Sequence, residues 1–148
     1  MPLRAIVYTS QIAAHVDESK RTQIVVDAGR FNRLAGVTGV LLFDGARFLQ
    51  YFEGPQDGVD AVYARVKSSR SHVELLELAS GRIGQRLFPY WGMHMIPVEA
   101  MDTSRLVAAS WTDFDTTAPS DGRSSSGILG LGEVVSHHLP AGHEPSIN

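Results

Sequence analysis

The sequence predicts an α/β fold: a ferredoxin-like sandwich in which two helices cover one face of a mixed β-sheet, followed by a C-terminal helical extension. Five short segments are apolar and rich in β-branched residues, which is typical of strands. Two longer segments between them carry apolar residues at helical spacing. The resulting order is β-α-β-β-α-β-β, and a chain of 148 residues fits one such domain with a single core.

A strand over residues 3–10 opens the chain, because this stretch is short and rich in β-branched side chains. Asp17 is a candidate N-cap for the helix that follows it. Apolar residues recur at helical spacing over residues 20–34, so we expect the first helix there. Gly36 is a natural stop for this helix, since glycine readily takes the left-handed conformation that ends helices.

A hairpin forms the centre of the predicted sheet. The continuous apolar run over residues 37–43 indicates a buried strand. The Asp-Gly-Ala stretch at 44–46 is a turn signal that leads into a partner strand over residues 47–53. The Gly-Pro pair at 54–55 then starts a second helix, with Asp57 in its first turn, where a negative charge suits the helix dipole.

The rest of the chain divides at Pro97. Two further strands are predicted at residues 73–80 and 89–96, and they complete a domain over residues 1–97. The remaining residues, 98–148, form a C-terminal extension of mixed character. It contains a short helix over 102–112, a linker rich in Asp, Thr, Ser and Gly over 113–127, and a weak helix over 128–139.

Composition narrows the classes of function. The chain has 13 Lys and Arg against 16 Asp and Glu, a net charge of -3 that argues against a dedicated nucleic-acid binder. It has no Cys, which excludes a disulfide framework, a thiolate metal site and a Cys nucleophile, and suits a cytoplasmic location. The apolar runs are too short to span a membrane, and the N-terminus has no signal-peptide pattern.

Three polar side chains fall on apolar faces of the predicted elements. Tyr8 lies on the inner face of the first strand, Asn32 on the apolar face of the first helix, and Gln50 between two phenylalanines of its strand. A buried amide or phenol without a partner costs roughly 1–3 kcal/mol. These groups therefore either satisfy one another in a structural network or bind a flat ligand with a polar edge, and the pattern alone leaves both possibilities open.

Five separated motifs in this chain resemble those of BLUF domains, the blue-light sensors that use flavin. Each motif alone is unspecific, but the combination and its order over residues 3–96 are highly specific. The motifs are Tyr8-Thr9-Ser10, Phe31-Asn32 followed by Gly36 to Leu42, Arg47 to Gly54, His72, and Trp91-Gly92-Met93. The resemblance implies a photosensor domain over residues 1–97 that is not an enzyme, with FAD as cofactor and FMN as a second possibility.

The resemblance also assigns roles to individual residues. Tyr8 matches the electron donor, Gln50 the glutamine between tyrosine and flavin, and Asn32 the residue that hydrogen-bonds the flavin's pyrimidine edge. The remaining matches are Ile24 and Phe48 beside the ring, His72 near the ribityl side and Arg65 at the phosphate end. In the family, light moves an electron and a proton from Tyr8 by way of Gln50. Their return leaves the glutamine rotated or in another tautomer, and the flavin oxidised again.

Output is expected through the fifth strand and the residues after it. Trp91, Met93 and Met95 share one face of that strand, a pattern that alone is more typical of a core than of a cofactor site. In BLUF domains, Trp91 and Met93 match residues that can exchange near the glutamine. The extension would pass the change to another subunit or to a separate signalling protein, and a homodimer is the default assembly.

The chain departs from the family pattern near the phosphate position. Arg70 is displaced by one residue relative to His72, and Phe31 is apolar where a polar residue is frequent. The choice between FAD and FMN is therefore not fixed. Two rival functions remain: a ferredoxin-like binding module that has lost flavin, and a small acylphosphatase-like hydrolase. The hydrolase needs a phosphate loop with Arg after the first strand, and residues 9–16 contain neither Gly nor Arg.

The histidines of the C-terminal tail and two isolated glutamates are weaker signals of function. His137, His138 and His143 lie in a Gly- and Pro-rich tail that sets no metal geometry, so we expect no metal site. Glu53 and Glu99 are isolated carboxylates, and the sequence identifies no partner for either of them.

Overall fold

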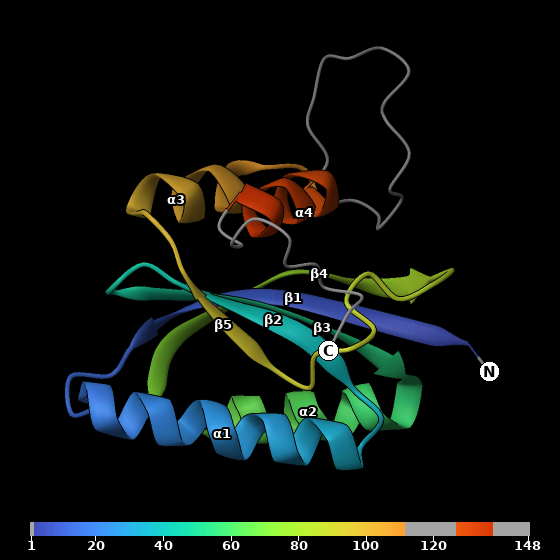
Figure 1. Ribbon diagram of the computed structural model, residues 1–148, viewed down its shortest axis with the longest axis horizontal. Coiled ribbons are helices and arrows are strands. Elements are labelled where there is room, and N and C mark those ends of the chain that lie inside the picture. The colour runs from blue at the N-terminus through green and yellow to red at the C-terminus, as the bar shows by residue number, and fades with distance from the viewer. Residues whose placement is uncertain (1, 112–126, 138–148) are drawn as a thin grey trace.

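A five-stranded mixed sheet forms the centre of the computed structural model, which describes residues 2–111 and 127–137. The strand order is β4-β1-β3-β2-β5 (Figure 1). All neighbouring strands are antiparallel except β2 and β5, which run parallel. The strands are β1 (Leu3–Ile12), β2 (Thr38–Phe43), β3 (Arg47–Pro55), β4 (His72–Ile83) and β5 (His94–Pro97).

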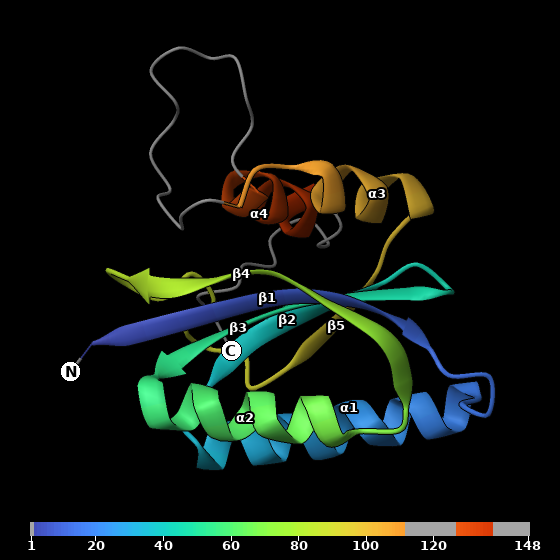
Figure 2. The same ribbon diagram turned by 180° about the vertical axis from the view of Figure 1, so that it is seen from behind.

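Helices cover both faces of the sheet. One face carries α1 (Glu18–Leu34) and α2 (Gln56–Ser68), and the opposite face carries α3 (Ala100–Ala108) and α4 (Gly127–His137), as Figures 1 and 2 show from two sides. The predicted element order, the mixed sheet and the C-terminal helices are confirmed. The predicted linker at 113–127, except for Gly127, and the histidines at 138 and 143 lie outside the described residues. No helix in the described part of the chain is long and apolar enough to cross a membrane.

The ends of α1 follow from the residues predicted to cap it. The Asp17 side chain accepts a hydrogen bond of 2.8 Å from the Lys20 backbone N–H, so it caps one of the free N–H groups at the start of the helix. The helix ends just before Gly36, which has a φ of +74°. Glycine takes this left-handed conformation without the steric cost that a Cβ would bring.

Two apolar cores lie on opposite faces of the sheet, because successive strand side chains point to opposite sides. Ile6, Tyr8 and Phe52 pack against Val59 and Val62 of α2. The larger core joins the other face of the sheet to the two C-terminal helices. It contains Val7, Leu42, Leu49, Tyr51, Trp91, Leu106, Trp111, Ile128, Leu131 and Val135, with neighbours. The C-terminal helices are therefore packed on the sheet and share a core with it.

The fifth strand is shorter than predicted, since only four residues, His94–Pro97, are strand where 89–96 was expected. The reason is the close approach of Gly92 to α1, where a Cβ on Gly92 would come within 2.7 Å of the Arg33 side chain. The Gly92 carbonyl accepts a hydrogen bond from Asn32 Nδ2 at 2.9 Å instead of joining a strand ladder. The preceding residues form bends and a turn.

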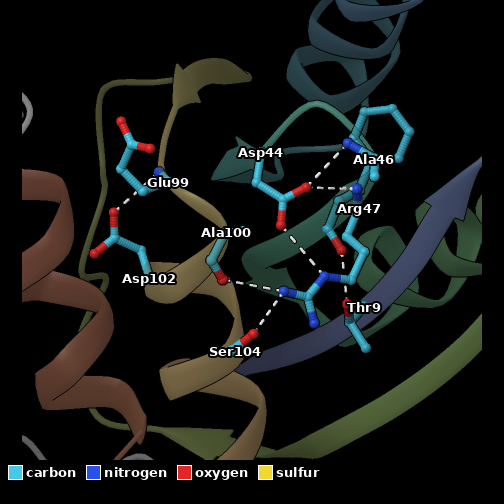
Figure 3. A network of polar contacts seen from close by, with 9 residues as sticks. Thr9, Asp44, Ala46, Arg47, Glu99, Ala100, Asp102 and Ser104 are labelled. Carbon is cyan, nitrogen blue, oxygen red and sulfur yellow. Dashed lines mark hydrogen bonds and ion pairs between the residues drawn. The ribbon is translucent and has the colours of Figure 1, made fainter.

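A polar junction joins the β2–β3 hairpin to the start of α3 (Figure 3). Asp44 Oδ1 accepts hydrogen bonds from the backbone N–H groups of Ala46, at 3.0 Å, and Arg47, at 2.7 Å. The Arg47 guanidinium bonds Asp44 Oδ2 at 3.2 Å, the Ala100 carbonyl at 3.0 Å and Ser104 Oγ at 2.8 Å. The hairpin turn and α3 are therefore held by one arginine.

Candidate functional site

A cavity of about 200 Å³ lies between α1, α2 and the sheet. Its walls are mainly apolar, with a few polar and cationic groups. The lining residues are Tyr8, Val16, Arg21, Ile24, Val25, Asp27, Ala28, Asn32, Leu41, Phe48, Gln50, Val62, Arg65, Val66, Ser69, Ser71, His72 and Met93. An apolar cavity with a few placed polar groups is the usual form of a small-molecule site.

Tyr8 and Gln50 meet in this cavity because their strands place them directly opposite each other. The β1–β3 register pairs the two residues, and both side chains are at most 5% exposed. The Tyr8 hydroxyl donates a hydrogen bond to Gln50 Oε1. Burial, with a smaller contribution from Tyr63, raises the pKa of Tyr8 far above its usual value of 10.0, so the phenol keeps its proton.

The other end of the Gln50 amide faces Met93. Gln50 Nε2 lies 3.8 Å from Met93 Sδ, and a thioether sulfur is only a weak acceptor. Gln50 therefore has one strong hydrogen bond on its oxygen side and one weak contact on its nitrogen side. A rearrangement of the amide gives up little on the Met93 side.

Asn32 connects the cavity to the segment that precedes β5. It is 2% exposed and lines the cavity, and its Nδ2 donates to the Gly92 carbonyl. The next residue after Gly92 is Met93. The same asparagine therefore borders the cavity and fixes the backbone beside the Gln50 contact.

The far end of the cavity carries cations and orphaned polar atoms. His72 Nε2 bonds the Val66 carbonyl at 3.0 Å, which makes Nε2 the protonated nitrogen and leaves Nδ1 buried with no partner among the described residues. Arg65 lies over the Phe31 ring at 4.6 Å. Arg21 lies over the Phe43 ring at the same distance, and its Nε is buried without a partner in the described part of the chain.

Arg21 was missed by the sequence analysis. It lies three residues before Ile24 on α1, and residues at this spacing share a helix face. That spacing was the available signal. Arg70 does not line the cavity, whereas the serines on both sides of it, Ser69 and Ser71, do.

The structure brings together eight of the nine residues that the sequence singled out. Tyr8, Ile24, Asn32, Phe48, Gln50, Arg65, His72 and Met93 all line the cavity. Trp91 does not, because it stacks on Phe88, at 5.7 Å, and on His94, at 4.4 Å, within the core on the opposite face. Trp91 and Met93 were expected on one face of a strand, but the turn at Gly92 places them on opposite sides of the sheet.

The residues present fit a flat ligand with a polar edge and an anionic tail. A self-contained hydrogen-bond network accounts for the Tyr8–Gln50 contact but leaves His72 Nδ1 and Arg21 Nε orphaned on residues that line the cavity. Buried polar atoms without partners are rare, and a ligand is one standard explanation. Flavin meets the requirement, since its ring is flat, one edge bears donors and acceptors, and its tail carries phosphate.

Comparison with known proteins points to the same ligand. Residues 3–94 match the protein-family model described as "BLUF: Sensors of blue-light using FAD". The blue light- and temperature-regulated antirepressor BluF of Escherichia coli K12 is 29% identical over 107 residues, which cover 72% of this chain and 27% of that protein. A photoactivated adenylate cyclase subunit beta-like protein of Euglena gracilis is 26% identical over 97% of this chain and 16% of its own length.

Solved structures agree with the sequence comparison. The dark-state structure of BlrB, described as a BLUF protein, has a TM-score of 0.71 and 25% identity, and the match covers 93% of this chain and 98% of that one. A bacterial light-regulated adenylyl cyclase has a TM-score of 0.63 and 29% identity over 70% of this chain and 32% of its own. The chain thus spans less than a third of the first curated relatives, but nearly all of BlrB.

Proposed function

This chain belongs to the BLUF family, sensors of blue light using FAD, and on that premise we propose that Tyr8, Gln50 and Met93 form its light-driven switch. The chain is a flavin-binding blue-light photoreceptor. When bound, flavin supplies the absorption of blue light and accepts an electron in its excited state. The observation that carries the proposal is the Tyr8–Gln50 hydrogen bond inside the cavity, with Met93 on the other side of the same amide.

Tyr8 is the residue placed to give up an electron and its phenolic proton. Its raised pKa keeps the proton on the oxygen in the dark, and the hydrogen bond to Gln50 Oε1 provides a path for it. Gln50 then leaves its dark arrangement either by rotation, which takes its nitrogen away from Met93, or by tautomerisation, which changes the protons on its oxygen and nitrogen in place. Return of the proton and electron restores Tyr8, so the chain undergoes a change of hydrogen bonds without net chemistry.

The proposed cofactor contacts divide by chemistry. Asn32 holds the polar edge of the ring, while Ile24 and Phe48 pack against its faces. His72 Nδ1, as a free acceptor, suits a hydroxyl of the ribityl chain. Arg65, together with Arg21, provides cationic donors for phosphate, a group that both FAD and FMN carry.

We propose that output leaves through the segment containing Met93 and reaches α3 over β5. A second link is the Arg47 junction, which begins next to Phe48 in the cavity wall and ends on Ser104 of α3 (Figure 3). Residues 1–97 then act as the sensor and residues 98–148 as the output extension. The similarity to an antirepressor and to cyclases supports a protein partner or a homodimer as the recipient, and the absence of Cys supports a cytoplasmic site of action.

Absorption spectra in the dark and directly after blue light test the switch. We expect a flavin spectrum that shifts slightly to the red and relaxes in darkness. Tyr8→Phe and Gln50→Leu should retain flavin and lose the shift, while Tyr90→Phe and Gln11→Leu, at exposed positions, should keep it. A normal shift in either cavity variant contradicts the proposed roles. A protein that takes up neither FAD nor FMN supports instead a ferredoxin-like module that has lost flavin.

A further inference from the structure

One buried carboxylate has no part in the proposed switch. Glu53 lies on β3 three residues after Gln50, so it points to the opposite face of the sheet, and its exposed fraction is 0%. Burying a carboxylate is costly unless its oxygens are hydrogen-bonded. The groups that hydrogen-bond Glu53 therefore show which part of the structure this buried carboxylate stabilises.

The strongest partners of Glu53 are two successive backbone N–H groups in the segment between β4 and β5. Glu53 Oε1 accepts from Leu87 N at 2.7 Å, and Oε2 accepts from Phe88 N at 2.6 Å. The Tyr51 hydroxyl adds a third hydrogen bond, to Oε1, at 2.8 Å. Both oxygens accept hydrogen bonds at once, and this arrangement favours the ionised carboxylate.

Arg86 secures the same segment beside Glu53. Its guanidinium donates to Thr38 Oγ1 at 2.8 Å and to the Gly36 carbonyl at 2.7 Å. Burial raises the pKa of Glu53 above its usual value, while the two N–H bonds, Tyr51 and the charge of Arg86 oppose this change. The segment is thus clamped to β2 and β3 immediately before it turns towards the cavity.

The contacts of Glu53 and Arg86, which we call the clamp, are linked to Met93 by a ring contact and by backbone hydrogen bonds. The Phe88 ring stacks on Trp91, with centroids 5.7 Å apart and planes 6° apart. The Trp91 carbonyl accepts from Gly39 N at 2.9 Å, and the next carbonyl, of Gly92, accepts from Asn32. Only four residues separate Phe88 from Met93, and these three contacts all act on the segment from Phe88 to Gly92.

We propose that Glu53 is a positioning residue that fixes the segment from Leu87 to Met93 and thereby holds the Met93 sulfur against Gln50. The inference rests on the proposed switch only for its consequence in light. In the dark it makes a separate claim about where Met93 lies. Glu53, on one face of the sheet, thus fixes the position of Met93, which contacts Gln50 on the other face.

Glu53→Gln tests this with a nearly unchanged side-chain shape. A glutamine keeps one acceptor oxygen, but its NH₂ group would meet a backbone N–H, so one of the two bonds is lost. We expect amide exchange at Leu87 or Phe88 to accelerate at least about tenfold, the effect of losing a hydrogen bond to a charged group. Glu133→Gln, an exposed position on α4, is the matched control.

The decisive measurement is the ¹³C-methyl NMR signal of Met93 in the flavin-loaded protein kept in the dark, assigned with Met93→Leu. We expect this signal to move or broaden in Glu53→Gln, while those of Met95 and Met101 stay in place and Glu133→Gln matches the wild type. An unchanged Met93 signal, with faster exchange confined to residues 86–88, overturns the proposal and leaves Glu53 a purely structural group.

A second variant covers the case in which Glu53→Gln does not fold. Arg86→Ala removes the neighbouring clamp from a partly exposed site and leaves the carboxylate in place. We expect the same Met93 signal to move, by a smaller amount, and an unmoved signal refutes the proposal. Absence of a light-induced red shift in the wild type would refute the proposed function and leave the dark-state result for Met93 standing. An unmoved Met93 signal would refute only the role of Glu53, so the two failures are distinguishable.

Discussion

Replacing Asp44 by Asn is expected to weaken the junction between the β2–β3 hairpin and α3. The Asp44 side chain is 2% exposed, and its oxygens accept three hydrogen bonds, from the backbone N–H groups of Ala46 and Arg47 and from Arg47 Nε. An asparagine keeps one acceptor oxygen, but its NH₂ group would face another donor. Hydrogen bonds to charged groups contribute about 1.5–3 kcal/mol, so the free energy of unfolding should fall by roughly 2 kcal/mol at pH 7.

The direction of the pH dependence follows from the lowered pKa of Asp44. Burial acts to raise this pKa, but the backbone hydrogen bonds from Arg47 and Ala46 and the charge of Arg47 together outweigh burial. The folded state therefore favours the carboxylate more than the unfolded state does. The resulting stabilisation is present above about pH 4, the pKa of an unfolded aspartate, and is lost as the pH falls through the lower folded value.

Thermal unfolding of the wild type and Asp44→Asn between pH 3 and pH 7 measures this effect, with the exposed Asp60→Asn as control. A loss of roughly 2 kcal/mol lowers the Tm by about 4–8 °C in a chain of this size at pH 7. The difference in Tm should shrink below about pH 4. An equal difference at pH 3 and pH 7 would refute the role of the ionised carboxylate, and no difference at pH 7 would refute the contribution of the junction.

Three further predictions concern the cavity and the C-terminal helices. Met93→Leu should keep the flavin and the red shift and change the free energy of unfolding by less than about 1.5 kcal/mol. It should alter the dark-recovery rate, because Gln50 Nε2 loses its sulfur partner, and an unaltered rate counts against that contact. Arg21→Ala should weaken the binding of FAD about tenfold in a titration followed by flavin fluorescence, as expected for a lost charge-assisted hydrogen bond. The control Arg30→Ala, at an exposed position, should bind FAD like the wild type, and equal affinities of the two variants would exclude Arg21 from the phosphate site. Gly127→Ala places a Cβ 2.2 Å from the Trp111 ring and should lower the free energy of unfolding by about 1–3 kcal/mol. The dark flavin spectrum should stay in place, and a shifted spectrum would show that α4 packing shapes the cavity.

The fold and three polar residues of the cavity could be predicted from sequence because their signals are local, whereas Ile24, Phe48, Arg65, His72 and Met93 were assigned to the site by the resemblance to BLUF domains. Strand and helix periods placed Tyr8, Asn32 and Gln50 on inward faces, and Gly36 marked a helix end. Glu53 could not be placed in this way. Its partners are backbone N–H groups 34 and 35 residues further along the chain, and a backbone group has no residue type to recognise. The late start of the fifth strand, at His94, was missed for a similar reason, since the approach of Gly92 to α1 is a tertiary contact.

The position of Trp91 bears on how the signal leaves the cavity. Met93 lines the cavity, and Trp91, two residues earlier, packs in the core shared with Leu106 of α3. An exchange of the two side chains beside Gln50 would break the hydrogen bonds that hold the carbonyls of Trp91 and Gly92, each worth about 0.5–1.5 kcal/mol. A shift of the whole segment retains them. Because Met93 and Trp91 lie on opposite faces of the sheet, we expect a shift of the segment that follows Met93 to displace Trp91 in the core beneath α3 as well. On the proposed output route, a change at Gln50 would then reach the C-terminal helices without an exchange.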